Sequence, residues 1–175
     1  MFSNPQKIIS QLDLQSGSRV ADVGAGSGAY ALAAAKAVGE HGKVFAVEVQ
    51  KELLSRLERE ARSKSVHNIE AVWGDAEQEN GTHLASGACD AAIIANILFQ
   101  ALDKTGLARE AARIIKPRGR ALVVDWSGSF GGAGPAPSAV VSKQKAQEVF
   151  ESAGLAFERE IAAGSNHYAI IFRKP

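Results

Sequence analysis

Three closely spaced glycines, Gly24, Gly26 and Gly28, could form a cofactor-binding loop. Glycine lets a backbone turn sharply and approach a ligand closely, and a helix that begins at such a turn presents free N–H groups. The spacing predicts a loop between a buried strand over 19–24 and a helix over 28–39. The alternative is a tight strand-to-helix turn without a ligand, but three close glycines weaken a fold unless the space is used.

The same loop is compatible with a second class of cofactor. Gly24, Gly26 and Ala29 fit the dinucleotide pattern G-x-G-x-x-A, so a nicotinamide protein is a rival interpretation. A P-loop is excluded because no Lys-Ser/Thr pair follows the glycines. The nicotinamide interpretation is weaker, because a dehydrogenase needs a substrate domain that 175 residues cannot supply.

Acidic side chains end the next two predicted strands. Glu48 lies at the end of the strand over 43–49, where a carboxylate can accept both hydroxyls of an adenosine ribose. Asp75 ends the strand over 69–75, where its carboxylate and a free backbone N–H could bind an adenine edge. A strand-end acid or a turn aspartate is the plain structural alternative for each. Because these groups share one edge of an open α/β sheet with the glycines, we expect a ligand site there.

The elements that position these residues alternate between strands and helices. Strands are predicted over 19–24, 43–49, 69–75, 89–97, 120–126, 156–163 and 167–174, and helices over 5–13, 28–39, 51–64, 104–117 and 142–154. This order predicts a single α/β domain over 1–175, with a mostly parallel sheet covered by helices on both faces. The last two strands must be antiparallel, because three residues cannot make a parallel crossover. Pro117 is expected to end its helix.

The composition excludes several classes of protein. Twenty Lys and Arg residues against 19 Asp and Glu residues give a net charge of +1, which argues against a generally basic nucleic-acid binder. The single Cys89 excludes an internal disulfide and a zinc site of several thiolates, and we predict no metal site. No apolar run is long enough to span a membrane, and the N-terminus lacks a signal-peptide layout. We therefore expect a cytoplasmic protein.

Taken together, these segments resemble the class I AdoMet-dependent methyltransferases. The matching motifs are VADVGAGSG, VFAVEV, GDA, CDAAIIANIL and REAARIIKPRGRALVVDW, followed by a terminal helix and hairpin. The resemblance runs from about residue 15 onward and is closest to the small-molecule enzymes of the ubiquinone/menaquinone-biosynthesis type. It implies a doubly wound, seven-stranded sheet of order 3-2-1-4-5-7-6, with strand 7 antiparallel.

The resemblance also implies S-adenosyl-L-methionine as cofactor and S-adenosyl-L-homocysteine as product. The implied cofactor-binding residues are Asp22, Gly24, Ala25, Gly26, Gly28, Glu48, Val49, Asp75, Ala76 and Asn96. The glycine loop would wrap the methionine end, and Asp22 would support the amino group directly or through water. Asn96 would offer its backbone carbonyl to the ammonium.

The remaining roles concern the nucleoside end of the cofactor. The resemblance implies that Glu48 holds the ribose and that Asp75 accepts the adenine amino group. The backbone N–H of Ala76 would donate to an adenine ring nitrogen. In this family catalysis is largely positioning, so a general base is optional and we assign no catalytic residue from the sequence.

The acceptor is less clearly marked in the sequence. Residues 96–100 read NILFQ in place of the D/N-P-P-Y/F motif, which counts against methylation of an adenine amine or a glutamine amide. We therefore expect a small-molecule acceptor and a monomer or homodimer. An RNA methyltransferase is an alternative, since 44–76 is loosely similar to fibrillarin-type enzymes, although their Lys-Asp-Lys-Glu set is not evident. A non-catalytic AdoMet-binding protein is a third possibility.

Four side chains are candidates for the acceptor side of the site: Phe99, Gln100, Asp125 and Trp126. The Gly- and Pro-rich segment 127–138 follows them. It is either a lid over the acceptor, with Phe130 as its apolar anchor, or a flexible connector.

Overall fold

The seven strands form one sheet of order β3-β2-β1-β4-β5-β7-β6. The computed structural model describes residues 3–132 and 134–175. The strands are β1 (Arg19–Val23), β2 (Lys43–Glu48), β3 (Ile69–Trp73), β4 (Cys89–Ala95), β5 (Ile115–Trp126), β6 (Ala156–Ile161) and β7 (His167–Arg173). The helices are α1 (Pro5–Ile9), α2 (Ala29–Val38), α3 (Lys51–Ser63), α4 (Lys104–Ile114) and α5 (Lys143–Ser152), with a short 3-10 turn at Pro137–Ala139.

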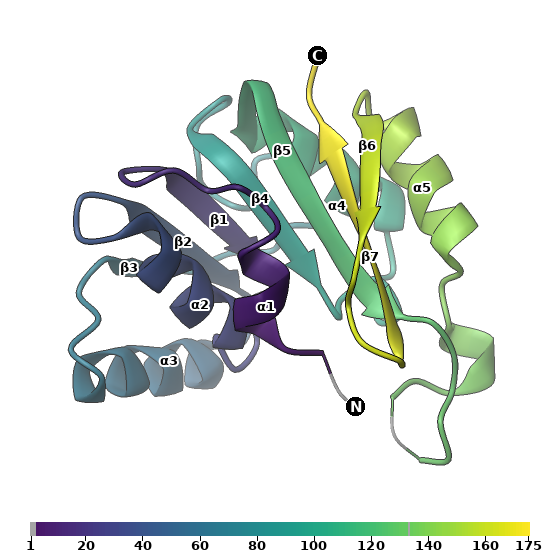
Figure 1. The fold of residues 1–175 in the computed structure, drawn as a ribbon, viewed down its shortest axis with the longest axis horizontal. Coiled ribbons are helices and arrows are strands. Elements are labelled where there is room, and N and C mark those ends of the chain that lie inside the picture. The colour runs from purple at the N-terminus through teal and green to yellow at the C-terminus, as the bar shows by residue number, and fades with distance from the viewer. Residues whose placement is uncertain (1–2, 133) are drawn as a thin grey trace.

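The first five strands run parallel, and β7 lies antiparallel between β5 and β6 (Figure 1). This arrangement confirms both the predicted strand order and the reversed final hairpin. The carboxyl ends of β1, β2, β3 and β4 therefore meet at one edge of the sheet, where the candidate residues are concentrated.

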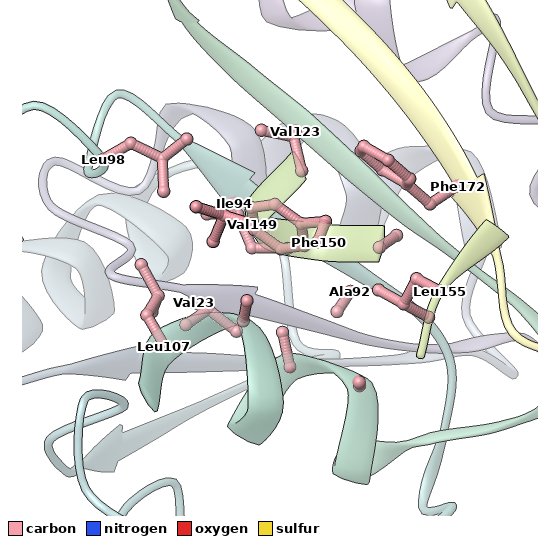
Figure 2. Packing of buried hydrophobic residues seen from close by; sticks show 14 of the residues in the cluster. Val23, Ala92, Ile94, Leu98, Leu107, Val123, Val149, Phe150, Leu155 and Phe172 are labelled. Atoms are coloured by element: carbon pink, nitrogen blue, oxygen red, sulfur yellow. The ribbon is translucent and has the colours of Figure 1, made fainter. Parts of the chain in front are cut away.

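Helices cover both faces of the sheet, as predicted (Figure 1). α1 and α2, with Leu57 of α3, pack on one face, while α4 and α5 pack on the other. Figure 2 shows the hydrophobic cluster on the α4 and α5 face. In this cluster Phe150 of α5 stacks on Phe172 of β7, with ring centroids 5.4 Å apart. β4 is apolar on both sides, as a central parallel strand requires. Ile93 lies in the cluster on the α1 and α2 face, and Ile94 lies in the cluster on the α4 and α5 face.

The first helix is shorter than predicted, and the residues that follow it bond to the edge strand β6. Asn4 caps it by accepting the Lys7 N–H at 3.1 Å, but the helix ends at Ile9. Asp13 has a φ of +56°, which a right-handed helix cannot contain. The Arg159 guanidinium of β6 donates to the Asp13 carboxylate at 2.7 Å, so this segment is held in place.

α4 also ends earlier than predicted. Its last residue is Ile114, and Ile115 is already extended and starts β5. Proline disfavours the helical conformation at the residue before it, so Pro117 keeps Lys116 out of the helix as well as ending it at its own position. The Lys174 ammonium donates to the carbonyls of Ala112 and Ile115, at 2.8 and 2.7 Å, and so satisfies acceptors at the helix end.

Candidate functional site

A cavity of about 730 Å³ opens at the carboxyl ends of β1 to β4. Four segments line it, each at the end of one of these strands: 24–27, 47–50, 74–77 and 95–97. Its size lies within the range of small-molecule sites, roughly 300–1,000 Å³. The structure thus brings together the ends of four strands that are separate in the sequence.

The glycine loop docks on the end of β2 through its backbone. The N–H groups of Gly24 and Ala25 both donate to the Val47 carbonyl at 2.9 Å. Gly24 has a φ of +71°, and a Cβ there would lie 2.2 Å from Cδ1 of Ile97. Gly26 has a φ of +53°, but a Cβ there would meet nothing closer than the Gly24 carbonyl oxygen at 4.0 Å. The positive φ and the contact with the Ile97 side chain therefore explain Gly24, while Gly26 leaves open space at the cavity.

Gly28 has a different role, because it does not line the cavity. It precedes the first residue of α2, with a φ of +81°. A Cβ there would lie 2.2 Å from Cδ1 of Leu57, which is buried in α3. Gly28 thus allows close packing between the start of α2 and α3.

Glu48 is held rigidly at the edge of the cavity. It is 7% exposed, and its carboxylate accepts the Gly26 N–H at 2.9 Å and the Gln50 N–H at 3.0 Å, one on each oxygen. Each carboxylate oxygen has two lone pairs, so the side chain can still accept two hydroxyl groups. The neighbouring Val49 lines the cavity and is largely exposed.

Asp75 and Ala76 form the β3 side of the cavity. One carboxylate oxygen of Asp75 accepts the Glu77 N–H at 3.0 Å, which fixes the turn after β3. Its second oxygen keeps its acceptor capacity. Ala76 is buried, and its side chain belongs to the core on the α4 and α5 face.

Asn96 lines the cavity in a strained conformation, with a φ of +56°. Its N–H donates to the Val124 carbonyl at 2.8 Å, and its own carbonyl accepts the Gln100 side-chain amide at 3.1 Å. Its side-chain Oδ1 is buried and has no hydrogen-bond partner among the described residues. A buried acceptor of this kind, at a cavity, is suited to a donor on a ligand.

The model of a methyltransferase domain family matches residues 14–166. The chain belongs to this methyltransferase family. The match confirms the resemblance on which the cofactor prediction rests.

Relatives of this methyltransferase chain include enzymes with different acceptors. Demethylmenaquinone methyltransferase of Geobacillus stearothermophilus is 25% identical over 120 residues, which is 69% of this chain and 50% of that protein. Protein-L-isoaspartate O-methyltransferase of Methanococcus maripaludis is 43% identical over 65 residues, 37% of this chain and 31% of that protein. The chain spans about half the length, or less, of the curated relatives it matches.

Solved structures extend the similarity over nearly the whole chain. A SAM dependent methyltransferase from Aquifex aeolicus superposes with a TM-score of 0.89 and 25% identity, covering 99% of this chain and 91% of that one. The [4+2]-cyclase SpnF superposes with a TM-score of 0.83 and 17% identity, covering 98% and 79%. The second comparison shows the fold alone, and SpnF is named as a cyclase. The fold by itself therefore does not determine the reaction.

Within the methyltransferase chain, Asp22 lies behind the cavity and not in its lining. It is 2% exposed, under α2, and its Oδ2 has no hydrogen-bond partner among the described residues. Burial raises the pKa of Asp22 to about 7, the Glu48 charge acts in the same direction, and the Ala31 backbone N–H acts in the opposite one. Asp22 alternates with buried apolar residues on β1, so its side chain enters the core beneath the glycine loop.

The acceptor-side candidates divide into two groups. Gln100 lines the cavity, whereas Phe99, Asp125 and Trp126 do not. Asp125 is fully buried and therefore unavailable to an acceptor. The Trp126 ring packs on His167, with centroids 4.3 Å apart.

The segment 127–138 lies beside Trp126 at the end of β5 (Figure 1). The Phe130 ring is 6.4 Å from the Trp126 ring, and Gly134 has no room for a Cβ against the same indole. Residue 133 lies outside the described residues, and the proposed lid includes it. These contacts place Phe130 near Trp126, at the end of β5.

Among the cavity-lining residues that sequence reasoning missed are Ser3, Pro5 and Tyr30. Tyr30 is the second residue of α2, directly after the glycine loop, so its position could have indicated the site. Ser3 and Pro5 come from the N-terminal segment, which no motif connects with the sheet edge. The packing of α1 on α2 brings this segment to the cavity.

The described residues contain no group of three or more His, Cys, Asp or Glu side chains that could hold a metal ion. In the same part of the chain, no helix is long and apolar enough to cross a membrane.

Proposed function

We propose that the chain transfers a methyl group from S-adenosyl-L-methionine to a small-molecule acceptor. The observation that carries the proposal is the cavity at the carboxyl edge, where the glycine loop and the Glu48 carboxylate are joined by a hydrogen bond of 2.9 Å. Membership of the methyltransferase family supports the same activity.

The residues at the cavity fit the proposed cofactor. Gly26 leaves space for a ligand against its backbone, and Glu48 keeps two acceptor positions for ribose hydroxyls. Asn96 presents a backbone carbonyl and a buried Oδ1 to a donor, which suits an ammonium group. Asp75 and the backbone of Ala76 would bind the adenine edge, and Val49 would pack beside it.

Two of the predicted residues would act indirectly. Asp22 lies behind the loop, so we propose that it influences the amino group through water or through the electrostatic potential at the cavity. Gly28 would help by allowing the loop and α2 to pack closely on α3.

When bound, the cofactor would supply a methyl group on a positively charged sulfur, ready for transfer to a nucleophile. The chain would contribute orientation, which lowers the entropic cost of bringing two reactants together. Ala95, Ile97 and Leu107 line the cavity and would limit the access of water. We assign no general base.

We favour a small molecule over RNA as the acceptor, because part of the basic surface near residues 104–120 is neutralised. Three of the six basic residues of the 104–120 region are paired with acids, among them Arg113 with Glu110 and Arg120 with Glu158. Lys116 is likewise paired with Asp90. Pairing of this kind reduces the attraction of these cations for a phosphate backbone. The demethylmenaquinone methyltransferases among the relatives are consistent with a small-molecule acceptor.

We further propose that residues 1–175 act as one domain, in the cytoplasm, as a monomer or homodimer. All seven strands, from Arg19 to Arg173, belong to one sheet, which supports the single domain. Light scattering during size-exclusion chromatography would give the oligomeric state.

The test is release of S-adenosyl-L-homocysteine in the presence of pooled small metabolites or total RNA. The proposal predicts release with the metabolite pool, lost in the Glu48→Ala variant. Release only with RNA would support the alternative RNA methyltransferase. Binding of S-adenosyl-L-homocysteine without turnover in either pool would support the non-catalytic alternative.

A further inference from the structure

A buried carboxylate outside the cavity, Asp125, holds part of the cavity wall. Asp125 is fully buried at the end of β5. One of its oxygens accepts the Leu98 N–H at 2.8 Å, and the other accepts the Trp126 N–H at 2.7 Å. It thereby links the end of β5 to the segment that follows β4.

That segment, 96–101, forms one side of the cavity. Asn96, Ile97, Gln100 and Ala101 all line it, while Leu98 points into the core on the α4 and α5 face (Figure 2). The Asp125 carboxylate therefore bonds to the middle of the segment, on the side opposite the cavity. The position of Leu98 determines where the residues on either side of it lie.

Other bonds fix the two ends of the same segment. At one end, the Gln100 amide donates to the Asn96 carbonyl at 3.1 Å. At the other end, the Lys104 ammonium donates to the Ala101 carbonyl at 2.7 Å. Asn96 also has a positive φ of +56°, a conformation that persists only when its surroundings enforce it. The Asp125 contact is one of these restraints.

We propose that Asp125 is a positioning residue whose ionised carboxylate holds the 96–101 wall in the form that binds the cofactor, so that its protonation weakens binding. The inference rests on the proposed function, because it concerns the same cavity. Asp125 itself does not touch the cofactor or the acceptor.

The chemistry of the carboxyl group explains the dependence. An ionised carboxylate can accept from both N–H groups, whereas a protonated carboxyl carries a proton on one oxygen and loses acceptor capacity there. A buried N–H left without an acceptor is costly, so protonation favours movement of Leu98 or Trp126.

The surroundings bring this protonation close to neutral pH. Burial raises the pKa of Asp125 to about 6, while the N–H groups of Trp126, Leu98 and Phe99 and the charge of Lys104 act in the opposite direction. Tyr168 faces Asp125 across the β5–β7 pair, and burial and the Asp125 charge both raise the Tyr168 pKa. Lys104 at the start of α4 and Tyr168 on β7 are thus two ionisable groups that act on Asp125.

Binding and protonation must influence each other equally. If the cofactor product binds better to the ionised form, then bound product raises the acid dissociation constant of Asp125 by the same factor and so lowers its pKa. S-adenosyl-L-homocysteine is the probe, since it needs no acceptor. The Leu98 amide reports on Asp125 directly, because its N–H donates to the carboxylate.

The first experiment follows the assigned Leu98 amide proton by NMR from about pH 5 to pH 8. We expect a titration with a midpoint near 6 in the free protein, moving down by about 0.5 pH units or more with saturating S-adenosyl-L-homocysteine. An unchanged midpoint, or no titration at Leu98, would overturn the proposal. Absence of binding at pH 8 would overturn the proposed function itself, and this inference with it.

The second experiment compares Asp125→Asn with Asp90→Asn by calorimetry. Asp90 is a matched control, because its carboxylate also accepts a backbone N–H, that of Arg19 at 2.7 Å, but at the opposite edge of the sheet. At pH 8 we expect Asp125→Asn to weaken S-adenosyl-L-homocysteine binding by about fivefold or more, and Asp90→Asn to leave it unchanged.

The ratio of wild-type to Asp125→Asn affinity separates positioning from a merely structural role. It should fall toward one as the pH drops from 8 to about 5, because the wild type then loses the ionised carboxylate. Titration of other residues at the cavity affects both proteins and cancels in the ratio. A ratio that is the same at both pH values would overturn the proposal.

Discussion

The carboxylate of Glu48 accepts the backbone N–H of Gly26 at 2.9 Å, so the acid that ends β2 holds the glycine loop that follows β1. The two motifs are 22 residues apart in the sequence but act as one structural unit. The second carboxylate oxygen accepts the Gln50 N–H at the start of α3. Any change at Glu48 therefore affects both the acceptor for a ribose and the shape of the loop.

Replacing Glu48 with alanine should weaken binding of S-adenosyl-L-homocysteine by about 1–3 kcal/mol, or about 5- to 150-fold. The variant loses the charged acceptor and leaves the Gly26 N–H without its partner. Calorimetry would measure the loss. Glu52→Ala, an exposed acid in the first turn of α3, is the control and should bind like the wild type. An unchanged dissociation constant for Glu48→Ala would mean that the acid is merely structural.

Gly28→Ala should destabilise the fold more than Gly154→Ala does. Both glycines have a φ between +80° and +90°, so both substitutions carry a cost of about 1–2 kcal/mol for left-handed backbone. Only at Gly28 would the new Cβ also meet Leu57, at 2.2 Å, whereas Gly154 has nothing within 4 Å. Urea unfolding of the two variants would measure the difference. Equal losses would show that α3 moves aside freely.

Asp22 should make the protein less stable as the pH rises toward 8. Its folded pKa of about 7 lies above the unfolded value of 3.8, so the folded state binds more protons between these values. The free energy of unfolding therefore falls as pH increases through this window, and the loss is complete above the folded pKa. Between pH 6.5 and 8 we expect a decrease of about 0.5–1 kcal/mol, which Asp22→Asn should remove. An equal decrease in the variant would assign the effect to another group.

Phe130→Ala should lower turnover while leaving the affinity for S-adenosyl-L-homocysteine unchanged. The ring packs near Trp126 at the end of β5, outside the lining of the cofactor cavity. The activity of the variant would be measured in the S-adenosyl-L-homocysteine release assay, with the metabolite pool that supports turnover. Full activity would indicate that 127–138 is a connector, and the acceptor site would then be sought near Gln100 and the N-terminal segment.

The strand order could be predicted from the sequence because it depends on two things. One is the local alternation of strands and helices, and the other is the resemblance of the motifs to a known family. The three residues 164–166 required an antiparallel hairpin, and the antiparallel pairing of β7 with β6 confirms it. Helix ends were less predictable. Ile114 ends α4 because the backbone before Pro117 joins the sheet, and this depends on a partner strand that is distant in the sequence.

Buried polar groups were the hardest part of the fold to predict. Glu110 lies on the inward side of α4 with Leu107, Ala111 and Ile114, a position that helical periodicity could have shown. It accepts the Thr82 N–H at 3.1 Å and thus organises the polar segment 76–88, which the sequence left unassigned. The pairing could not be predicted, because it joins groups 28 residues apart.

The sequence predicted those residues of the candidate site that directly follow the ends of strands, because the motifs identify where the strands end. Glu48, Asp75 and Asn96 line one cavity, whereas Asp22 lies behind it. Strand alternation predicts only that a side chain lies on one face of the sheet. Whether it reaches the cavity depends on how α2 and the glycine loop pack above it. The same limit applies to Asp125, which was expected near the acceptor and is fully buried.

The most direct test of the central claim is calorimetric titration of the protein with S-adenosyl-L-homocysteine and, separately, with NAD. The account predicts a dissociation constant on the micromolar scale for S-adenosyl-L-homocysteine and no measurable binding of NAD. Tighter binding of NAD, or no binding of S-adenosyl-L-homocysteine, would contradict it.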